Sequence, residues 1–570
     1  MEILIRNGVV YDPLNGIEGE VMDIAIKDGK IVPTEKVDPK EAYVIDARGM
    51  LVVPGGIDLH THVAGPKVNL GRVMRPEDHR VSILRYIPGR RHSGSGKTTP
   101  STTVIGYRYI RMGYTMIIEP ASPPIKSRHT HEELDDIPYV DKAMLPLFDS
   151  NWFILKFIRE DARDKVATYI AWLLRTVKGY AVKLVDPGAG EAWGWGRGIG
   201  ISLDDEIPGW GVKPRDIIEY TLDACIRLGI PHKVHIHCNR LGFPGNYETT
   251  LETIRLTEKF PILDRPIMHI THIQFNAYGG ETWGNLRSAS EELAREINRN
   301  PRVSIDLGQV IFGTQTTMTA DAPYEYVLYH LTKWKWSSTD AECECAAGIV
   351  PYKYRKKSYV NTIQWCIGLE IALLVRDPWR VVISTDHPNG GPFTRYPWIV
   401  AWLMSKRARD EVMKKLNERG LRKCILPSID REYTWTEFVI ITRAAPAKLL
   451  GLEKTKGHLG VGADADVAIY DIDPREVDPS RDYEKLIKAL RRAKYVIKGG
   501  EVVVKDGEVT RVIYGSTYYI NPVVSPDLEK SVKAEIEQWF KRWYSVSLST
   551  YEVRIEELRS VKEVKVISRV

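Results

Sequence analysis

The strongest constraint on the fold is a series of short apolar runs, each of which ends in polar residues. After residue 50 there are eight of them: LVVPGGIDLHTH (51–62), YTMIIEP (114–120), NWFILKFI (151–158), YAVKLVDP (180–187), KVHIHCN (233–239), PIMHITHI (266–273), VSIDLGQV (303–310) and RVVISTDHP (380–388). Stretches with helical periodicity, such as RDIIEYTLDACIRLG and SASEELAREINRN, separate several of these runs. Strands that alternate with helices in this way are typical of a (β/α)8 barrel. We therefore predict an α/β fold with such a barrel over residues 51–455.

The segments that flank the predicted barrel have a different pattern. Residues 1–50 and 456–515 contain short strand-like runs with turn signals, such as IAIKDGKIV and YVIKGGEVVVKDGEV, and lack long helical patterns. We expect these two flanks to pair into one small β-sandwich domain. Residues 516–570 contain the amphipathic run DLEKSVKAEIEQWFKRWY, which predicts a helix, followed by a charged, strand-like tail.

Charge and cysteine usage exclude several classes of function. The 570 residues include 80 basic and 74 acidic side chains, an excess too weak to indicate nucleic-acid binding. We find no apolar stretch long enough to span a bilayer, and MEILIRNGVVYDP resembles a strand and a turn rather than a signal peptide, so we expect a cytoplasmic protein. The six cysteines are scattered, and only Cys343 and Cys345 lie close together. This spacing argues against a disulfide framework or a redox cofactor in this chain.

Histidines and one aspartate gather where the predicted strands end. They are His60 and His62 in the first run, His235 and His237 in the fifth, His269 and His272 in the sixth, and Asp386 in the eighth. His60 and His62 are two residues apart on a strand, so their side chains point to the same face. The carboxyl ends of barrel strands meet at one mouth, where the active sites of such barrels lie. This grouping predicts a metal site.

Lys183 lies in the middle of the fourth run, where a strand would bury it. A buried ammonium without a partner is costly. After reaction with CO₂, however, the side chain becomes a carbamate, an anion whose two oxygens can bridge two divalent cations such as Zn²⁺. The alternative is that Lys183 extends toward solvent or pairs with Asp186.

These motifs together resemble the amidohydrolase superfamily of binuclear metal hydrolases, as does the later segment GHLGVGADADVAIYD. Longer segments between residues 55 and 398 are similar, more narrowly, to the A subunit of formylmethanofuran dehydrogenase. They include HTHVAGPKVNLGRVMRPED, HIHCNRLGFPGNYETT and STDHPNGGPFTRYPW. The resemblance implies a barrel of the metallo-dependent hydrolase type.

The resemblance also implies roles for individual residues. Its metal ligands are His60, His62 and Asp386 for one ion, His237 and His272 for the other, and carboxylated Lys183 as the bridge. His237 lies nearer the strand end than His235, which has the same parity and either supports a ligand or is the ligand itself. His269, three residues before His272, is expected to face away from the site as a core histidine. Substrate contacts are expected from Asn69, Arg72, Arg75 and Asn239.

The implied reaction joins formate and the primary amine of methanofuran to N-formylmethanofuran and water, with Asp386 moving the proton. In this family a molybdenum or tungsten pterin subunit, together with iron–sulfur subunits, supplies the formate by reducing CO₂. Two basic stretches, PGRRHSGSGK (88–97) and YKYRKKSY (352–359), are expected at the barrel mouth, near the acidic tail of the substrate. The alternatives are a formyl-hydrolase subunit of a formyltransferase/hydrolase complex, a cyclic amidase of the dihydroorotase or hydantoinase type, and a non-catalytic barrel scaffold.

Overall fold

Eight strands that pair in parallel form the centre of the molecule. The computed structural model describes residues 2–80, 96–197, 199–568 and 570. The central strands are, in chain order, β6 (Gly56–Asp58), β7 (Tyr114–Ser122), β8 (Asp141–Pro146), β9 (Val182–Val185), β10 (Val234–His237), β11 (Met268–Ile270), β14 (Val303–Asp306) and β18 (Val381–Val382). Every residue of these strands is buried, as expected of parallel strands that are covered on both faces.

The central strands pair in two parallel sheets that meet at both edges. One sheet has the order β18-β14-β11-β10-β9, and the other contains β8-β7-β6. Isolated parallel bridges join Leu147 to Lys183 and Thr61 to His387. The neighbours are therefore those of a (β/α)8 arrangement, but two of the joints are single bridges instead of continuous ladders.

The third predicted strand is in fact a helix. Trp152–Arg159 form α5, and the side chain of Asn151 caps the helix by accepting a hydrogen bond from the Phe153 N–H. The third central strand is instead β8, ten residues earlier in the chain. A short apolar run looks the same in a buried helix and in a buried strand, so periodicity alone does not separate the two.

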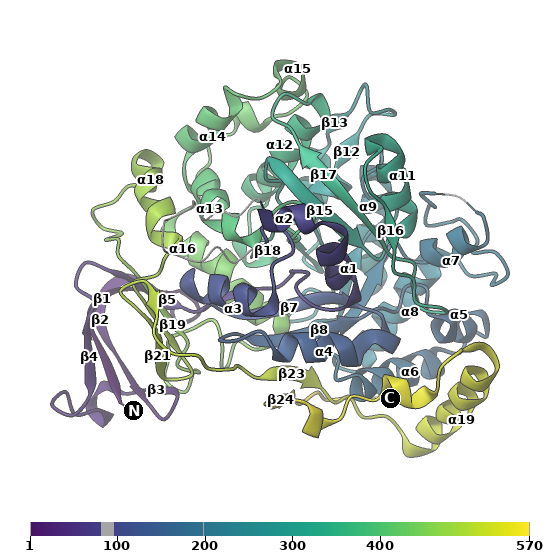
Figure 1. The fold of residues 1–570 in the computed structure, drawn as a ribbon, viewed down its shortest axis with the longest axis horizontal. Coiled ribbons are helices and arrows are strands. Elements are labelled where there is room, and N and C mark those ends of the chain that lie inside the picture. Colours follow the sequence, from purple (N-terminus) through teal and green to yellow (C-terminus); the bar gives the residue numbers. More distant parts are fainter. Residues whose placement is uncertain (1, 81–95, 198, 569) are drawn as a thin grey trace.

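Helices follow the strands and cover the outside of both sheets (Figure 1). The main ones are α3 (Thr102–Arg111), α4 (Ser127–Asp135), α6 (Arg163–Thr176), α8 (Pro214–Arg227), α9 (Tyr247–Leu256), α10 (Ser290–Arg299), α11 (Ala322–Thr332), α12 (Tyr359–Leu374), α13 (Tyr396–Met404) and α17 (Ala445–Leu450). Between β14 and β18 the chain also forms an antiparallel pair, β15 (Gly313–Thr319) and β17 (Gly348–Tyr354). This pair lies beside the site described below.

The two flanks pair into one sheet beside the central strands, at the left of Figure 1. Its nine strands are β1 (Ile3–Asp12), β2 (Ile17–Lys27), β3 (Lys30–Val32), β4 (Tyr43–Asp46), β5 (Leu51–Pro54), β19 (Val467–Tyr470), β20 (Tyr495–Lys498), β21 (Glu501–Lys505) and β22 (Glu508–Val509). Antiparallel pairing of β5 with β19 joins the strands of the two chain ends, although Leu51–Pro54 were expected in the barrel, and an isolated bridge also joins Lys30 to Asp464. The predicted sandwich is not confirmed, because among the described residues these strands belong to a single sheet. A helix that was not expected, α18 (Pro479–Leu490), lies within the second flank.

The C-terminal segment is packed against the central strands. Its predicted helix is present as α19 (Pro526–Trp543), and its tail forms β24 (Val561–Val564). Strand β23 (Thr517–Ile520) pairs with both β24 and β8. The tail therefore extends the β6–β8 sheet.

A buried ion network lies where the central strands meet the flank sheet. The ammonium of Lys456 is 2.5 Å from Asp141 Oδ2 on β8 and 2.6 Å from Asp466 Oδ2. Lys498 on β20 lies 2.8 Å from the same oxygen of Asp141. All four side chains are buried, so each charge depends on its partners.

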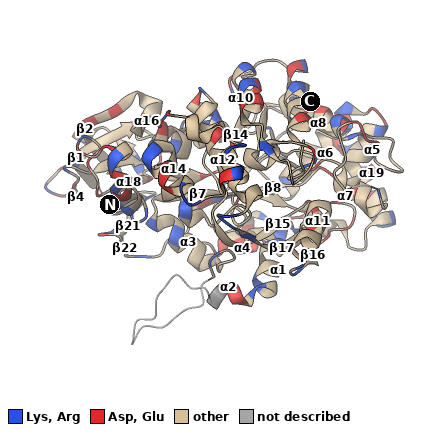
Figure 2. Ribbon diagram, turned by 90° about the horizontal axis from the view of Figure 1, so that it is seen from above, with Lys and Arg blue, Asp and Glu red and all other residues tan. Residues whose placement is uncertain are grey.

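Acidic and basic residues are interspersed over the ribbon (Figure 2). Within the described ranges, no helix combines the length and the apolar character needed to traverse a bilayer.

Candidate active site

A cavity of about 420 Å³ lies at the carboxyl ends of the central strands. All six side chains expected to bind metal line it: His60, His62, Lys183, His237, His272 and Asp386. They come from the first, fourth, fifth, sixth and eighth strands, or from the turns that follow them. The tertiary structure thus brings together residues that are more than 300 positions apart in the chain.

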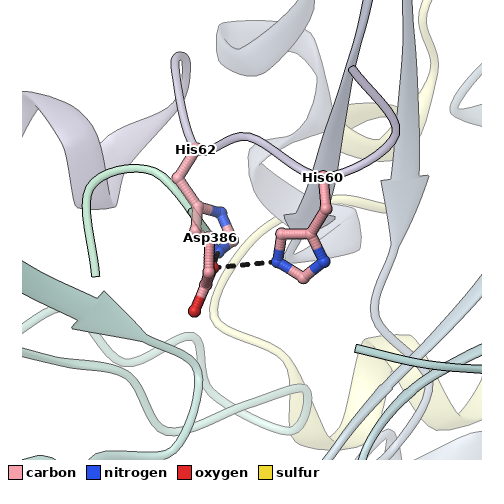
Figure 3. A group of neighbouring side chains, drawn as sticks. All are labelled: His60, His62 and Asp386. Carbon is pink, nitrogen blue, oxygen red and sulfur yellow. Dashed lines mark ion pairs between the residues drawn. The ribbon is translucent and has the colours of Figure 1, made fainter. Parts of the chain in front are cut away.

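His60, His62 and Asp386 point toward one another (Figure 3). The Nε2 atoms of His60 and His62 lie 2.9 and 3.3 Å from the same oxygen, Oδ1 of Asp386. The opposite ring nitrogens face two other carboxylates. Nδ1 of His62 is 2.9 Å from Glu119 Oε1, and Nδ1 of His60 is 3.1 Å from Asp306 Oδ2.

The protons on these rings can be placed from their partners. With a metal ion bound at Nε2, each ring would keep its one remaining proton on Nδ1, where the carboxylate of Glu119 or Asp306 can accept it. His60 Nε2 and Asp386 Oδ1 are buried and have no hydrogen-bond partner among the residues that the structure describes. Lone pairs that converge on a carboxylate oxygen repel it unless a proton or a metal ion lies between them. The three side chains therefore fit a divalent metal ion, and they form one of the groups whose ligand atoms are close enough to hold one.

The pKa of His60 supports this interpretation. Burial lowers this pKa, but the charges of Asp306 and Asp386 outweigh burial and raise it to about 9. The cavity thus attracts a positive charge to His60. A metal ion at this position would replace the proton, because metal ions and protons compete for the same lone pair.

His237 and His272 lie together on another part of the cavity wall. Their ring centroids are 4.8 Å apart, and His237 Nε2 lies 3.2 Å from Asp321 Oδ2. Within the described ranges, His237 Nε2 and His272 Nδ1 are buried and have no hydrogen-bond partner. Burial lowers the pKa of both rings well below its usual value, so both are neutral and have a free lone pair. His272 has a left-handed backbone conformation (φ 37°) just beyond β11. Gly308 allows this turn, because a Cβ atom at Gly308 would lie only 2.2 Å from the Cβ of His272.

Lys183 lies in the middle of β9 and is buried. Burial lowers its pKa to about 7, although Asp386 and Asp306 act to raise it. In the described part of the chain no ion pair joins Lys183 to Asp186, whose carboxylate accepts a hydrogen bond from Asn239 instead. Pairing with Asp186 therefore does not explain the lysine.

His235 and His269 lie inside the ring of strands, below the cavity. His235 places its two ring nitrogens 3.0 Å from His60 Nδ1 and 2.9 Å from His232 Nε2, and it does not line the cavity. His269 is buried and does not line the cavity, as expected of a core histidine, but its ring points into the ring of strands instead of away from it. Its ring stacks on His235 at 4.9 Å, and its Nε2 lies 3.3 Å from Asp306. The three-residue spacing from His272 predicted the wrong face, because β11 ends at Ile270 and the chain turns at His272. Side chains therefore do not alternate between the two faces from 269 to 272.

The four expected substrate contacts are not brought to the cavity. Their side chains are bound elsewhere: Asn69 to His129, Arg72 to Glu133, Arg75 to Thr316, and Asn239 to Asp186. Most of the basic stretch 88–97 lies outside the described residues. The stretch 352–359 does reach the cavity, which is lined by Tyr352, Lys353, Tyr354, Arg355 and Ser358.

Sequence reasoning missed the two carboxylates that orient the first histidine pair. Glu119 lies near the end of the second apolar run, and Asp306 lies within the seventh. Besides His62, Glu119 binds the backbone N–H groups of Val63 and Ala64 at 2.7 and 3.1 Å, so it holds the turn after β6. An acidic residue at a strand end was already the signal used for Asp386, and the same signal was present at both positions.

Comparison with known proteins gives matches over nearly the full chain. An amidohydrolase family model matches residues 43–504. Protein FwdA of Methanocaldococcus jannaschii is 48% identical over 99% of both chains. The A subunit of the formyltransferase/hydrolase complex Fhc of Methylorubrum extorquens is 36% identical over 94% of both. The crystal structure of the FhcABCD complex from the same organism, with methylofuran, contains a chain that superposes with a TM-score of 0.89 at 34% identity, with 100% of both chains covered.

Proposed function

The chain belongs to the amidohydrolase family, whose members have a TIM-barrel fold, and from this we propose that it is the amide-cleaving and amide-forming subunit of a formylmethanofuran dehydrogenase. It would interconvert formate and a methanofuran-like primary amine with the N-formyl amide and water. The observation that carries the proposal is the convergence of six side chains, several with unpaired lone pairs, on one cavity. The similarity to FwdA and to the A subunit of Fhc supports it.

We propose that the cavity holds two divalent metal ions. His60, His62 and Asp386 would bind one ion, His237 and His272 would bind the other, and a carboxylated Lys183 would bridge the two. Zinc suits a site of imidazole and carboxylate ligands. When bound, the ions would lower the pKa of a water molecule and polarise the carbonyl oxygen of the amide.

The carbamate would form from the free amine of Lys183. The nitrogen lone pair attacks the carbon of CO₂, a nitrogen–carbon bond forms, and one proton leaves to solvent. Only the uncharged amine can do this. A pKa of about 7, lowered by burial, makes that form abundant near neutral pH.

Asp386 is the proposed proton carrier. Burial acts to raise its pKa, but the interactions with His272 and His60 lower it well below the usual range, so the group is ionised and free to accept a proton. Asn389 donates a hydrogen bond of 2.9 Å to Asp386 Oδ2 and holds the carboxylate in place. During hydrolysis Asp386 would take a proton from the attacking water and pass it to the leaving amine. The synthetic direction reverses these transfers.

The outer part of the cavity suits an aromatic amine with an acidic tail. Tyr324, Tyr352 and Tyr354 line it together with Phe275 and Trp283. These side chains offer flat apolar surfaces against which a furan or phenyl ring can pack. Lys353 and Arg355 are part of the same wall and provide positive charge for carboxylates.

Amide formation in water is unfavourable, so the synthetic direction needs formate at a high local concentration. We propose that a molybdenum or tungsten pterin subunit, with iron–sulfur subunits, supplies it by reducing CO₂. A second candidate is the formyl-hydrolase role in a formyltransferase/hydrolase complex, favoured by the similarity to the A subunit of Fhc. Co-purifying subunits distinguish the two, because only the first assembly contains a pterin-dependent CO₂ reductase.

The proposal is tested with the protein isolated together with its partners. We expect about two divalent ions per chain and release of formate from N-formylmethanofuran, with loss of both the metal and the activity on chelation. Hydrolysis of dihydroorotate or a hydantoin, with no release of formate from formyl amides, would contradict it. Full activity in metal-free protein would contradict it as well.

A further inference from the structure

The interior of the ring of strands, directly below the cavity, is filled by histidines instead of aliphatic side chains. His235 and His269 occupy the same register layer as Lys183 and Ser304. His232 lies just before β10, and its ring is 5.2 Å from that of His235. All three histidines are buried. The interiors of such barrels are usually packed with branched aliphatic residues, and buried polar groups are costly unless paired.

These rings form a hydrogen-bonded chain that reaches His60. His60 Nδ1 lies 3.0 Å from His235 Nε2, and His235 Nδ1 lies 2.9 Å from His232 Nε2. His232 Nδ1 in turn lies 3.3 Å from the carbonyl oxygen of Leu449. Leu449 is in the last turn of α17, where carbonyl groups have no partner within the helix.

The backbone carbonyl at one end determines where every proton in the chain must be. A carbonyl only accepts, so His232 carries its proton on Nδ1 and offers the Nε2 lone pair to His235. His235 must then donate from Nδ1 and accept at Nε2. The only remaining arrangement at the last link is that His60 donates from Nδ1.

The other end of the chain requires the same arrangement. Asp306 Oδ2 lies 3.1 Å from His60 Nδ1 and 3.3 Å from His269 Nε2, so it accepts from His269 and shares the Nδ1 proton of His60 with His235. His269 then accepts at Nδ1 from the hydroxyl of Ser304, 2.9 Å away. Two independent acceptors, the carboxylate of Asp306 and the carbonyl of Leu449, therefore agree on one set of tautomers. In this set the Nε2 lone pair of His60 faces the cavity.

We propose that His232 and His235 are positioning residues that hold His60 in the tautomer and ring orientation needed to bind metal. The role rests on the metal site of the proposed function. Without an acceptor at position 232, His235 is free to carry its proton on Nε2, where it would face the Nδ1 proton of His60 at 3.0 Å. That conflict either turns the His60 ring or moves its proton to Nε2, and both outcomes obstruct the metal.

The test compares three variants of the full chain by metal affinity, measured for Zn²⁺ by competition with a chromophoric chelator. His232→Leu removes the acceptor, and we expect Zn²⁺ affinity to fall by about 10- to 100-fold, the usual cost of losing a group that orients a ligand. His232→Gln keeps an amide oxygen to accept from His235 and an amide N–H for Leu449, so its affinity should stay within about threefold of wild type. His131→Leu is the matched control, since His131 is also buried and bound to a backbone carbonyl, that of Val177 on another part of the fold.

Wild-type affinity in His232→Leu would overturn the proposal, and so would equal losses in the Leu and Gln variants, which would indicate packing alone. If His232→Leu does not fold, ¹⁵N spectra of histidine-labelled wild-type protein decide the question. We expect His60, His232 and His235 all to be protonated on Nδ1, and a proton on Nε2 of His232 or His235 would refute the chain. A wild-type protein that binds no metal would instead refute the proposed function.

Discussion

Replacement of Lys183 by alanine tests the central element of the proposed metal site. If a carbamate on Lys183 bridges the ions, the variant loses the only bridging ligand and one of the two anionic side chains assigned to the site. We expect it to retain less than one ion per chain after desalting and to have no measurable amidase activity. Acetate or formate should restore both in part, because a small carboxylate can occupy the space that the lysine vacates.

The size of the effect of CO₂ follows from the environment of Lys183. With a pKa of about 7, half of the amines are uncharged at pH 7. An unperturbed lysine, with a pKa of 10.5, would have roughly 0.03% in that form, so burial raises the reactive fraction by about 10³. The rate at which apo-protein takes up metal in bicarbonate should therefore rise between pH 6 and pH 8 and level off above that range.

The assay is reconstitution of apo-protein with Zn²⁺ in CO₂-free buffer and in bicarbonate, with retained metal measured after desalting. Lys142→Ala is the matched control, because Lys142 is also buried and also has a lowered pKa, about 8, but binds the carbonyls of Ile137 and Gly515 on the far side of β8. It should take up two ions with the same dependence on bicarbonate as wild type. Two ions per chain in Lys183→Ala, or uptake by wild type that is independent of CO₂, would refute the bridge.

Three further changes test other parts of the structure. Asp386→Asn keeps one ligating oxygen but removes the base, so zinc content should stay near normal while formyl-amide hydrolysis and synthesis both fall by about 10²- to 10⁴-fold; hydrolysis near the wild-type rate would rule out this proton carrier. Glu119→Gln weakens the group that orients His62, and we expect Zn²⁺ affinity to fall about 10- to 100-fold in chelator competition, whereas an unchanged affinity would show that Glu119 only holds the turn. Lys456→Met removes one of the two ammonium groups that pair with the buried carboxylates of Asp141 and Asp466, and it should cost about 3–5 kcal/mol of unfolding free energy at pH 7. Lys456 and Lys498 lower the pKa of Asp141 despite its burial, so the stabilisation in wild type is fully present above the unfolded pKa of about 4 and is lost as the pH falls below it. In denaturant titrations at pH 7 and pH 3 the difference between variant and wild type should therefore shrink in acid, and a constant difference would contradict the network.

The sequence alone predicted that the candidate metal ligands would gather at one edge, because strand geometry is local, and the family resemblance implied their individual roles. Side chains two apart on a strand share a face, and polar residues at the ends of successive parallel strands share one edge. That was sufficient to select His60, His62, Lys183 and Asp386, and to place the basic stretch 352–359 near the mouth. The pairing of the flanks and the C-terminal helix followed from equally local patterns.

Only the tertiary structure decided what surrounds those ligands. A buried apolar run can be a strand or a helix, so residues 151–158 were predicted as a strand although they form a helix. The direction of the His269 side chain was also mispredicted, because the chain turns at His272. Asn69, Arg72 and Arg75 reach partners elsewhere, which no local pattern reveals. The hydrogen-bonded chain joins positions 60, 232, 235 and 449, and these meet only when the strands and α17 pack together. Whether a ring nitrogen donates or accepts a hydrogen bond depends on the group that faces it, and only the tertiary structure determines which group that is.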